Sequence, residues 1–192
     1  MYNASFWVTG DLRRSLLTVQ QTTNGARYYF TYKYRDYQNR SDYAPIIRYA
    51  EVLLNVAEAY ARTGENDKAL NLLNAVRDRS VPAGDRFGST APADLVLAIL
   101  QERRIEFLAE GRRWPDIHRL ANDPQYGLAG IPAKIIVTQL QGSGADYDLD
   151  SRPTITPSFA AIPYSDFRFL WPIPSTEISA NITLRDQQNP GD

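Results

Sequence analysis

The sequence predicts a mainly α-helical protein, in which helical hairpins are decorated by long ordered loops and a few short strands. Apolar residues recur with helical spacing between residues 46 and 121. Stretches rich in proline and glycine, without such spacing, fill most of the remaining chain. With 192 residues, of which 43% are hydrophobic and 22% charged, the composition is that of a globular chain.

The first helix is predicted over residues 46–62. Its apolar face is broad, so we expect it to contact neighbours on more than one side. Glu58 and Arg62 have the spacing of a favourable ion pair, and Gly64 is expected to end the helix. The polar residues, spaced alternately three and four apart, are expected to form one narrow solvent-facing stripe: Arg48, Glu51, Asn55, Glu58 and Arg62.

A second helix is predicted over residues 67–79, with Asn66 as its N-cap. The short loop between the two helices predicts an antiparallel hairpin. Only one tetratricopeptide-like repeat is clear, and such arrays need about three repeats to bury their faces. The residues that match the repeat pattern are Leu53, Ala57, Tyr60, Gly64, Ala69 and Leu73.

Two more helices follow a loop at residues 80–92. Thr90 is expected to cap the third helix, which runs from about Pro92 to Glu110 and breaks at Gly111. Pro115 suits the first turn of a short fourth helix.

Strands are expected at two places. Residues 28–37 alternate with period two, which is typical of a strand. Residues 134–140 form a second candidate strand, and the tail 122–192 is expected to wrap the helical scaffold as ordered loops. The core face of the first strand is expected to carry Tyr28, Phe30, Tyr32 and Tyr34.

Residues 102–120 form the densest charged stretch of the chain. Glu102, Glu106 and Glu110 lie four apart, so they are either acid and base of a sugar hydrolase or members of an ion-pair lattice. Three carboxylates on one helical stripe repel each other unless cations neutralise them. Because arginine is abundant nearby, we favour a lattice that fixes packing register. The expected partners are Arg48, Arg77, Arg79, Arg103, Arg104 and Arg113.

Other chemical motifs are weak. His118 has no second metal ligand at helical spacing and is expected to be exposed. Asp146, Asp148 and Asp150 resemble the opening of a calcium loop, but Ser151 replaces the required glycine. The chain has no cysteine and a net charge of −1, which argues against thiol chemistry and nucleic-acid binding. We therefore predict no catalytic residue, no metal site and no cofactor.

Four ordered segments resemble the C-terminal region of the SusD/RagB family, the nutrient-binding lipoproteins of the Gram-negative outer membrane. They are RYAEVLLNVAEAYA (48–61), LNAVRDR (73–79), ERRIEFLAEGRRWPDIHRL (102–120) and WPIPSTEISANITLRDQQNPG (171–191), with weaker likeness at GDLRRS (10–15) and YKY (32–34). Family members are longer and begin with a lipidated cysteine. The resemblance therefore implies that residues 1–192 are the C-terminal portion of such a domain, with a tetratricopeptide-like scaffold at about 46–121 and a loop-rich tail at 122–192.

The resemblance also implies a function. A SusD-like protein binds an oligosaccharide or a peptide and acts with a SusC-like TonB-dependent transporter at the cell surface, held to the outer membrane by a lipid anchor that this chain lacks. No cofactor and no catalysis are implied. The residues implied to be scaffold are Arg48, Glu51, Glu102, Arg103, Glu106, Glu110, Gly111, Arg113, Trp114 and Asp116. We expect Trp114 to be a buried packing anchor.

Ligand contacts are expected from aromatic side chains in the first 45 residues, because a flat ring covers the apolar face of a sugar. The candidates are Trp7, Tyr29 and Tyr37. Two other functions stay open: a tetratricopeptide-type module that binds peptides or proteins in a helical groove, and an enzyme acting on sugars with two facing carboxylates.

Overall fold

The computed structural model describes residues 4–23, 26–136, 138 and 156–189. The described residues fall into two compact units. One consists mainly of residues up to Pro115, and the other of Asp116–Ile136 and residues 156–189. The expected wrapping of the scaffold by the tail stays a prediction.

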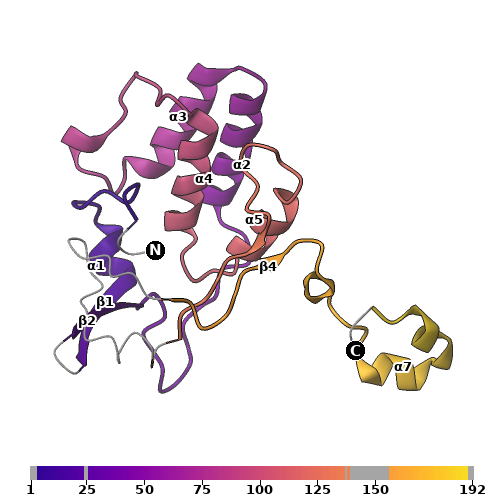
Figure 1. Cartoon of the computed structure of the whole chain (residues 1–192). Coiled ribbons are helices and arrows are strands. Elements are labelled where there is room, and N and C mark those ends of the chain that lie inside the picture. The colour runs from indigo at the N-terminus through magenta and orange to yellow at the C-terminus, as the bar shows by residue number, and fades with distance from the viewer. Residues whose placement is uncertain (1–3, 24–25, 137, 139–155, 190–192) are drawn as a thin grey trace. The chain divides into compact units, whose positions relative to one another are not determined.

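The first unit is built on three helices, α2 (Tyr49–Arg62), α3 (Asn66–Arg77) and α4 (Leu95–Glu106), which lie side by side (Figure 1). The mainly α-helical fold is thereby confirmed. Apolar side chains from all three helices share one core, as helical spacing requires. Its fully buried members are Leu54, Ala57, Ala69, Leu73 and Ile99.

The α2–α3 hairpin forms as the repeat pattern predicts. Gly64, with a φ of 83°, turns the chain at the end of α2 in a conformation that favours glycine. Ala57, Ala69 and Leu73 are fully buried, and Leu53 and Tyr60 pack against the same core. The short helix η1 (Ala83–Asp85) follows in the loop to α4.

The predicted caps are wrong. Asn66 is the first residue of α3 and makes no capping bond, and Glu65 precedes it. Helix α4 starts later than expected because Asp94, not Thr90, is its N-cap: the carboxylate accepts from the amide of Leu97 at 2.8 Å. The helix also ends at Glu106, before the predicted break.

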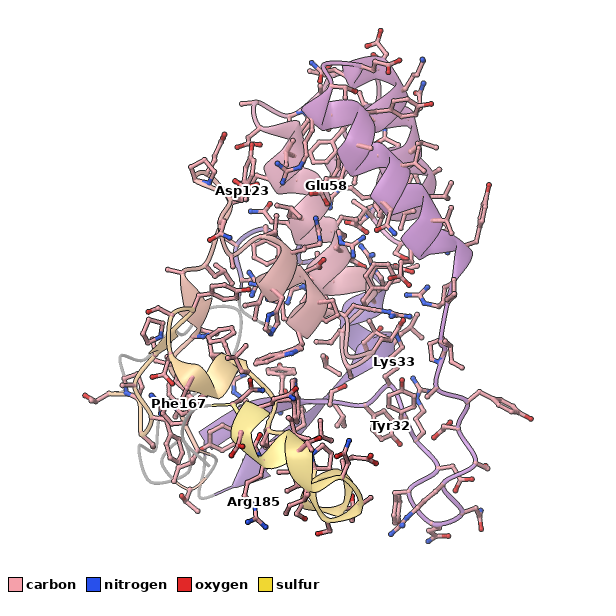
Figure 2. All side chains as sticks on the ribbon, turned by 90° about the vertical axis from the view of Figure 1, so that its right-hand side faces the viewer. Tyr32, Lys33, Glu58, Asp123, Phe167 and Arg185 are labelled. Carbon is pink, nitrogen blue, oxygen red and sulfur yellow. The ribbon has the colours of Figure 1, made fainter. Side chains whose placement is uncertain are left out.

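The polar stripe of α2 does not face solvent throughout. Glu58, labelled in Figure 2, is buried and pairs with Arg62 at 3.0 Å, which confirms the predicted ion pair. Glu51 pairs with Arg112 at 3.2 Å. The Asn55 side chain accepts from Arg103 of α4 at 2.5 Å. Polar contacts therefore hold much of this stripe against the unit.

An apolar stripe of α2 is exposed instead. Tyr49, Val52 and Val56 follow helical spacing and are 76%, 44% and 40% exposed. Ile46 and Ile47, just before the helix, are also exposed. The broad apolar face recognised in the sequence is thus only partly covered by the described residues.

A β-hairpin precedes the helices. Helix α1 (Arg13–Leu17) leads into β1 (Thr18–Thr23), which pairs antiparallel with β2 (Ala26–Thr31). Strand β1 was not predicted, although the Asn-Gly dipeptide at residues 24 and 25 is a strong hairpin signal.

The predicted strand 28–37 ends early, at Thr31. Tyr28 is buried and Phe30 half-buried, as alternation predicts. Tyr32 and Tyr34 are exposed, so their predicted core placement is wrong. They lie beyond the last ladder residue, where alternation no longer sets the direction of a side chain.

Helix α5 (Arg113–Arg119) carries the chain from the first unit into the second. In the second unit β3 (Gly130–Ile131) pairs with β4 (Ile162–Pro163), and a single bridge joins Lys134 to Phe159. The candidate strand at 134–140 is reduced to that bridge among its described residues.

The C-terminal segment contains η2 (Phe167–Phe169), α7 (Ser175–Ala180) and η3 (Ile182–Gln187). The side chain of Gln188 accepts from the amide of Ile173 at 2.8 Å and donates to its carbonyl at 3.1 Å. In the part of the chain that the structure describes, no helix has both the length and the apolar character needed to cross a membrane.

His118 is half-buried, so the expectation of an exposed residue is wrong. Its ring contacts the rings of Tyr164 and Phe169, with centroid distances of 5.7 and 5.2 Å. Packing among aromatic rings accounts for this histidine. The aspartates 146, 148 and 150 lie outside the described residues.

Candidate functional site

The three glutamates of α4 and its C-terminal turn stand at the centre of a buried network of ion pairs, here called the ion cluster. They come together with cations from four other segments of the first unit. Its members are Asp11, Arg13, Lys33, Arg48, Arg77, Arg79, Glu102, Glu106 and Glu110.

Glu102 is the deepest member, only 1% exposed. Arg13 donates to it at 2.5 Å and Arg77 at 3.3 Å. Asp11 holds Arg13 from the other side at 2.7 Å. Burial alone would lower the pKa of Arg13, but the hydrogen bonds and charges of Asp11 and Glu102 outweigh burial and raise it.

Glu106 receives three arginines: Arg48 at 2.7 Å, Arg13 at 2.9 Å and Arg79 at 3.0 Å. Burial alone would raise the pKa of this carboxyl. The hydrogen bond from Arg48 and the charges of Arg48, Arg13 and Arg79 outweigh burial, so the pKa is lowered. A carboxylate held ionised in this way is unsuited to act as a general acid near neutral pH.

Glu110 completes the ion cluster by pairing with Arg48 at 2.9 Å and with Lys33. The ion-pair lattice predicted from the sequence is therefore present, and Arg48, Arg77 and Arg79 belong to it. Of the other expected partners, Arg103 bonds Asn55 and Arg104 lies over the ring of Phe6. Arg13 and Lys33 were missed because neither lies on a helix that the sequence predicted to pack beside the glutamates.

The remaining scaffold residues lie around the end of α4 and in α5. Gly111 has a φ of 77°, which fits the predicted break. Asp116 is buried and accepts from Arg119 at 2.8 Å. Trp114 and Arg113 are half-buried, so the full burial expected for Trp114 is not observed. Pro115, next to the tryptophan, is exposed, which places this turn at the surface.

Trp7 is not a surface residue. Only 2% of it is exposed, and the guanidinium of Arg14 lies 4.8 Å from the centre of its ring. Arg14 also donates to the carbonyl of Trp7 and, at 2.8 Å, to that of Val8. The indole therefore packs as part of the core, and it is withdrawn as a ligand-binding candidate.

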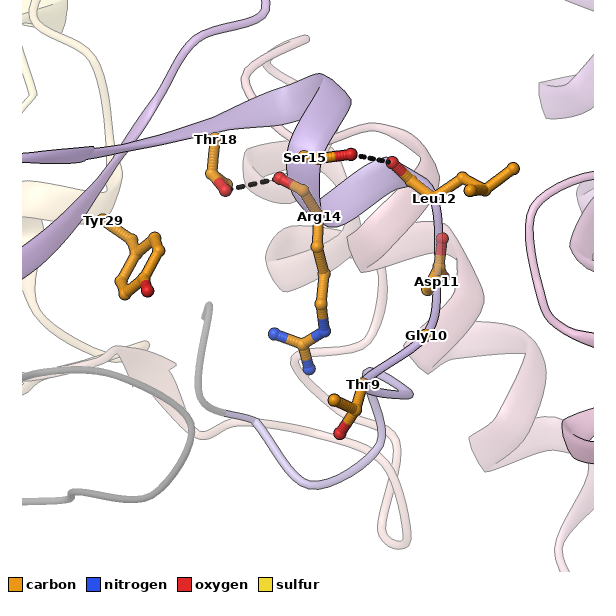
Figure 3. A pocket seen from close by; sticks show the side chains of 8 residues that line it. All are labelled: Thr9, Gly10, Asp11, Leu12, Arg14, Ser15, Thr18 and Tyr29. Carbon is orange, nitrogen blue, oxygen red and sulfur yellow. Dashed lines mark hydrogen bonds between the residues drawn. The ribbon is translucent and has the colours of Figure 1, made fainter.

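Tyr29 lines an open cavity of about 400 Å³, here called the hydroxyl pocket (Figure 3). Its hydroxyl donates to Gln20 at 3.0 Å. The hydroxyls of Ser15 and Thr18 donate to backbone carbonyls of α1 and its cap and keep acceptor capacity. The full lining is Thr9, Gly10, Asp11, Leu12, Arg14, Ser15, Thr18 and Tyr29.

A second cavity of about 320 Å³ lies beside the ion cluster and is called the tyrosine pocket here. Two tyrosines and four charged residues contribute to its wall. Its lining is Lys33, Tyr34, Asp42, Tyr43, Pro45, Arg48 and Glu110. Tyr37, the third candidate from the sequence, is 81% exposed on the loop between Lys33 and Asp42 but does not line this cavity.

The fold and the ion cluster define a class of helical-hairpin proteins in which a dense network of charges serves packing. Solved structures have the same fold: a SusD superfamily protein of Bacteroides fragilis (TM-score 0.61, 26% identical) and a protein of Bacteroides vulgatus thought to bind sugar (TM-score 0.62, 27% identical). A SusD superfamily protein of the latter species, 22% identical with a TM-score of 0.62, supports the fold alone.

The model of the SusD family matches residues 13–191, and the chain belongs to this family. A SusD-like protein of Formosa agariphila is 38% identical over 81 residues, which cover 38% of this chain and 16% of that protein. The solved relatives are matched over 92–95% of this chain but only 34–36% of their own length. The chain therefore spans about a third of those proteins.

Proposed function

We propose that this protein is a ligand-binding component of a nutrient uptake system at the outer membrane, with an oligosaccharide as the main class of ligand. The observation that carries this proposal is the family match over residues 13–191, together with the likeness to a protein thought to bind sugar. Its working partner is a SusC-like TonB-dependent transporter. The proposal places the protein at the cell surface and gives it no cofactor.

The ion cluster supports binding without catalysis. Each of its three glutamates is committed to at least two cations, which hold the carboxylates ionised. Aromatic side chains at the surface supply the binding chemistry instead. Tyr29 in the hydroxyl pocket and Tyr37 on the exposed loop remain candidates for sugar contact.

A binding array joined to a growth assay tests the function. The purified protein is applied to immobilised neutral and acidic glycans and to peptides. The gene is then deleted in the bacterium that carries it, and growth is followed on each glycan that binds. We expect retention of at least one oligosaccharide and loss of growth on it. Retention of peptides alone, with unchanged growth on every glycan, would refute the carbohydrate function.

The exposed apolar stripe of α2 favours a second candidate function, a tetratricopeptide-type module that binds a peptide or a protein. Tyr49, Val52 and Val56 would then contact an apolar helix. Val52→Lys should abolish peptide retention in the same array and leave glycan retention unchanged. If Val52→Lys retains both peptides and glycans as the wild type does, this candidate function is refuted.

A further inference from the structure

The tyrosine pocket has the composition of a sugar site and includes none of the ligand-binding candidates named from the sequence. Tyr34 and Tyr43 contribute to its wall, and Tyr43 is 97% exposed. An aromatic face that remains so open in a folded protein is available for stacking against the apolar C–H face of a sugar ring.

The loop that carries the two tyrosines is held in shape by two aspartates. The Asp42 carboxylate accepts from the amides of Arg35 and Asp36, both at 2.6 Å. Asp36 accepts from the hydroxyl of Ser41 and from the amide of Asn39 at 3.0 Å. The hydrogen bond from Ser41 is the main reason why the pKa of Asp36 is lowered. A loop ordered before binding loses less conformational entropy when the ligand arrives.

The charges around the pocket select the class of ligand. Two cations, Lys33 and Arg48, are matched by two carboxylates, Asp42 and Glu110. Glu110 is itself shared by both cations. Because the charges balance, neither an acidic nor a basic ligand gains from net attraction, and a neutral polyhydroxy ligand is favoured.

Polar groups for such a ligand are available. Among the described residues, the hydroxyls of Tyr34 and Tyr43 and the Oδ1 atom of Asp42 have no hydrogen-bond partner, and the Lys33 ammonium bonds only Glu110. Together they offer donors and acceptors to the hydroxyls on the edge of a sugar. The cavity of about 320 Å³ is at the small end of ligand sites, which run from roughly 300 to 1,000 Å³.

We propose that the tyrosine pocket binds a short neutral segment of an oligosaccharide, with Tyr43 and Tyr34 stacked on a sugar ring and Asp42 and Lys33 bonded to its hydroxyls. This inference rests on the proposed function and assigns a site for it. It differs from the sequence-based expectation, because neither Tyr29 nor Tyr37 lines this pocket.

The test is a titration of the 192-residue chain with neutral hexasaccharides of glucose, mannose, galactose or xylose, and with a uronic-acid hexasaccharide, by calorimetry. Tyr43→Ala and Tyr34→Ala should each weaken binding of the neutral ligand about three- to tenfold. Phe159→Ala is the matched control, because it removes an exposed aromatic ring that lines neither cavity, and it should leave affinity unchanged. Circular dichroism checks that every variant is folded.

Three results would overturn the assignment. Unchanged affinity in Tyr34→Ala and Tyr43→Ala, with a loss in Tyr29→Ala, would place the site in the hydroxyl pocket and leave the proposed function intact. Preference for the uronic acid would refute the neutral class. Absence of binding by the wild-type chain would refute binding in this pocket. The proposed function is tested separately, by growth of the deletion strain.

Discussion

The ion cluster and the tyrosine pocket share Lys33, Arg48 and Glu110 yet differ in almost every other physical respect. The ion cluster is closed: its carboxylates are buried, and each of its three glutamates is paired with two or more cations. The tyrosine pocket is open, its rings are exposed, and several polar atoms on its wall have no partner among the described residues. The difference suggests that the dense charges hold the scaffold and the sparse tyrosines meet the ligand.

The largest expected effect is a loss of stability when the ion cluster loses one of its carboxylates. Glu102→Gln leaves the buried charge of Arg77 without its carboxylate and removes one of the three carboxylates around Arg13, so the free energy of unfolding should fall by about 3–5 kcal/mol. Urea denaturation measures the fall. If the variant stays folded at low temperature, its glycan affinity should match that of the wild type. A loss of affinity at unchanged stability would reverse the roles of the two regions.

A comparable or somewhat smaller loss is expected from Trp7→Ala. The indole is almost fully buried, so its removal should cost about 3 kcal/mol. Thermal unfolding followed by circular dichroism measures the cost. Tyr37→Ala is the control, because an exposed side chain away from such features should change stability by less than about 0.5 kcal/mol. Equal effects of the two substitutions would contradict the burial of Trp7.

Acid should weaken the ion cluster. The pKa of Glu106 is lower in the folded protein than in the unfolded chain, where it is about 4.3. Its contribution is therefore complete above that value and is lost as the pH falls through the folded pKa. Glu106→Gln should lower the melting temperature at pH 7, flatten its fall below pH 5, and leave ligand affinity intact. If the melting temperature of this variant falls as steeply below pH 5 as that of the wild type, carboxylates other than Glu106 cause the acid dependence.

The smallest expected effect concerns the turn after α4. Ala109 has a φ of 63°, a left-handed conformation in which glycine is favoured over alanine. Ala109→Gly should therefore raise the free energy of unfolding by about 1 kcal/mol. Gly111→Ala, at a φ of 77°, is the matched opposite change and should lower it by a similar amount. Opposite signs in urea denaturation would confirm both.

The sequence predicted the elements that carry a strong period. Helices α2, α3, α4 and α5 lie where helical spacing, Gly64 and Gly111 place them, within a few residues at each end. Ion pairing of the three glutamates followed from their mutual repulsion. The helices needed only neighbours in sequence, whereas the ion pairs also needed arginines from the helices expected to pack beside the glutamates.

Inferences that depend on distant partners failed more often. The side of α2 that is covered could not be read from the helix alone, because Arg103 and Arg112 bond its polar residues Asn55 and Glu51. Trp7 was predicted to be a surface aromatic because the sequence alone does not show that Arg14 covers its ring. Strand β1 was missed because its sequence, TVQQTT, is mostly polar and shows no alternation. The Asn-Gly dipeptide that follows it was the one available signal.

The span of the ion cluster along the chain also sets the timing of its assembly. Arg13 and Glu102 are separated by 89 residues, so the pair cannot form until nearly the whole first unit has been synthesised. At about 5–20 residues per second, Glu102 is added roughly 5–20 s after Arg13. During that interval the α2–α3 hairpin, whose contacts are local, can already fold. Its early formation would leave the N-terminal segment as the last part to close, and so as the part most open to chaperones and proteases.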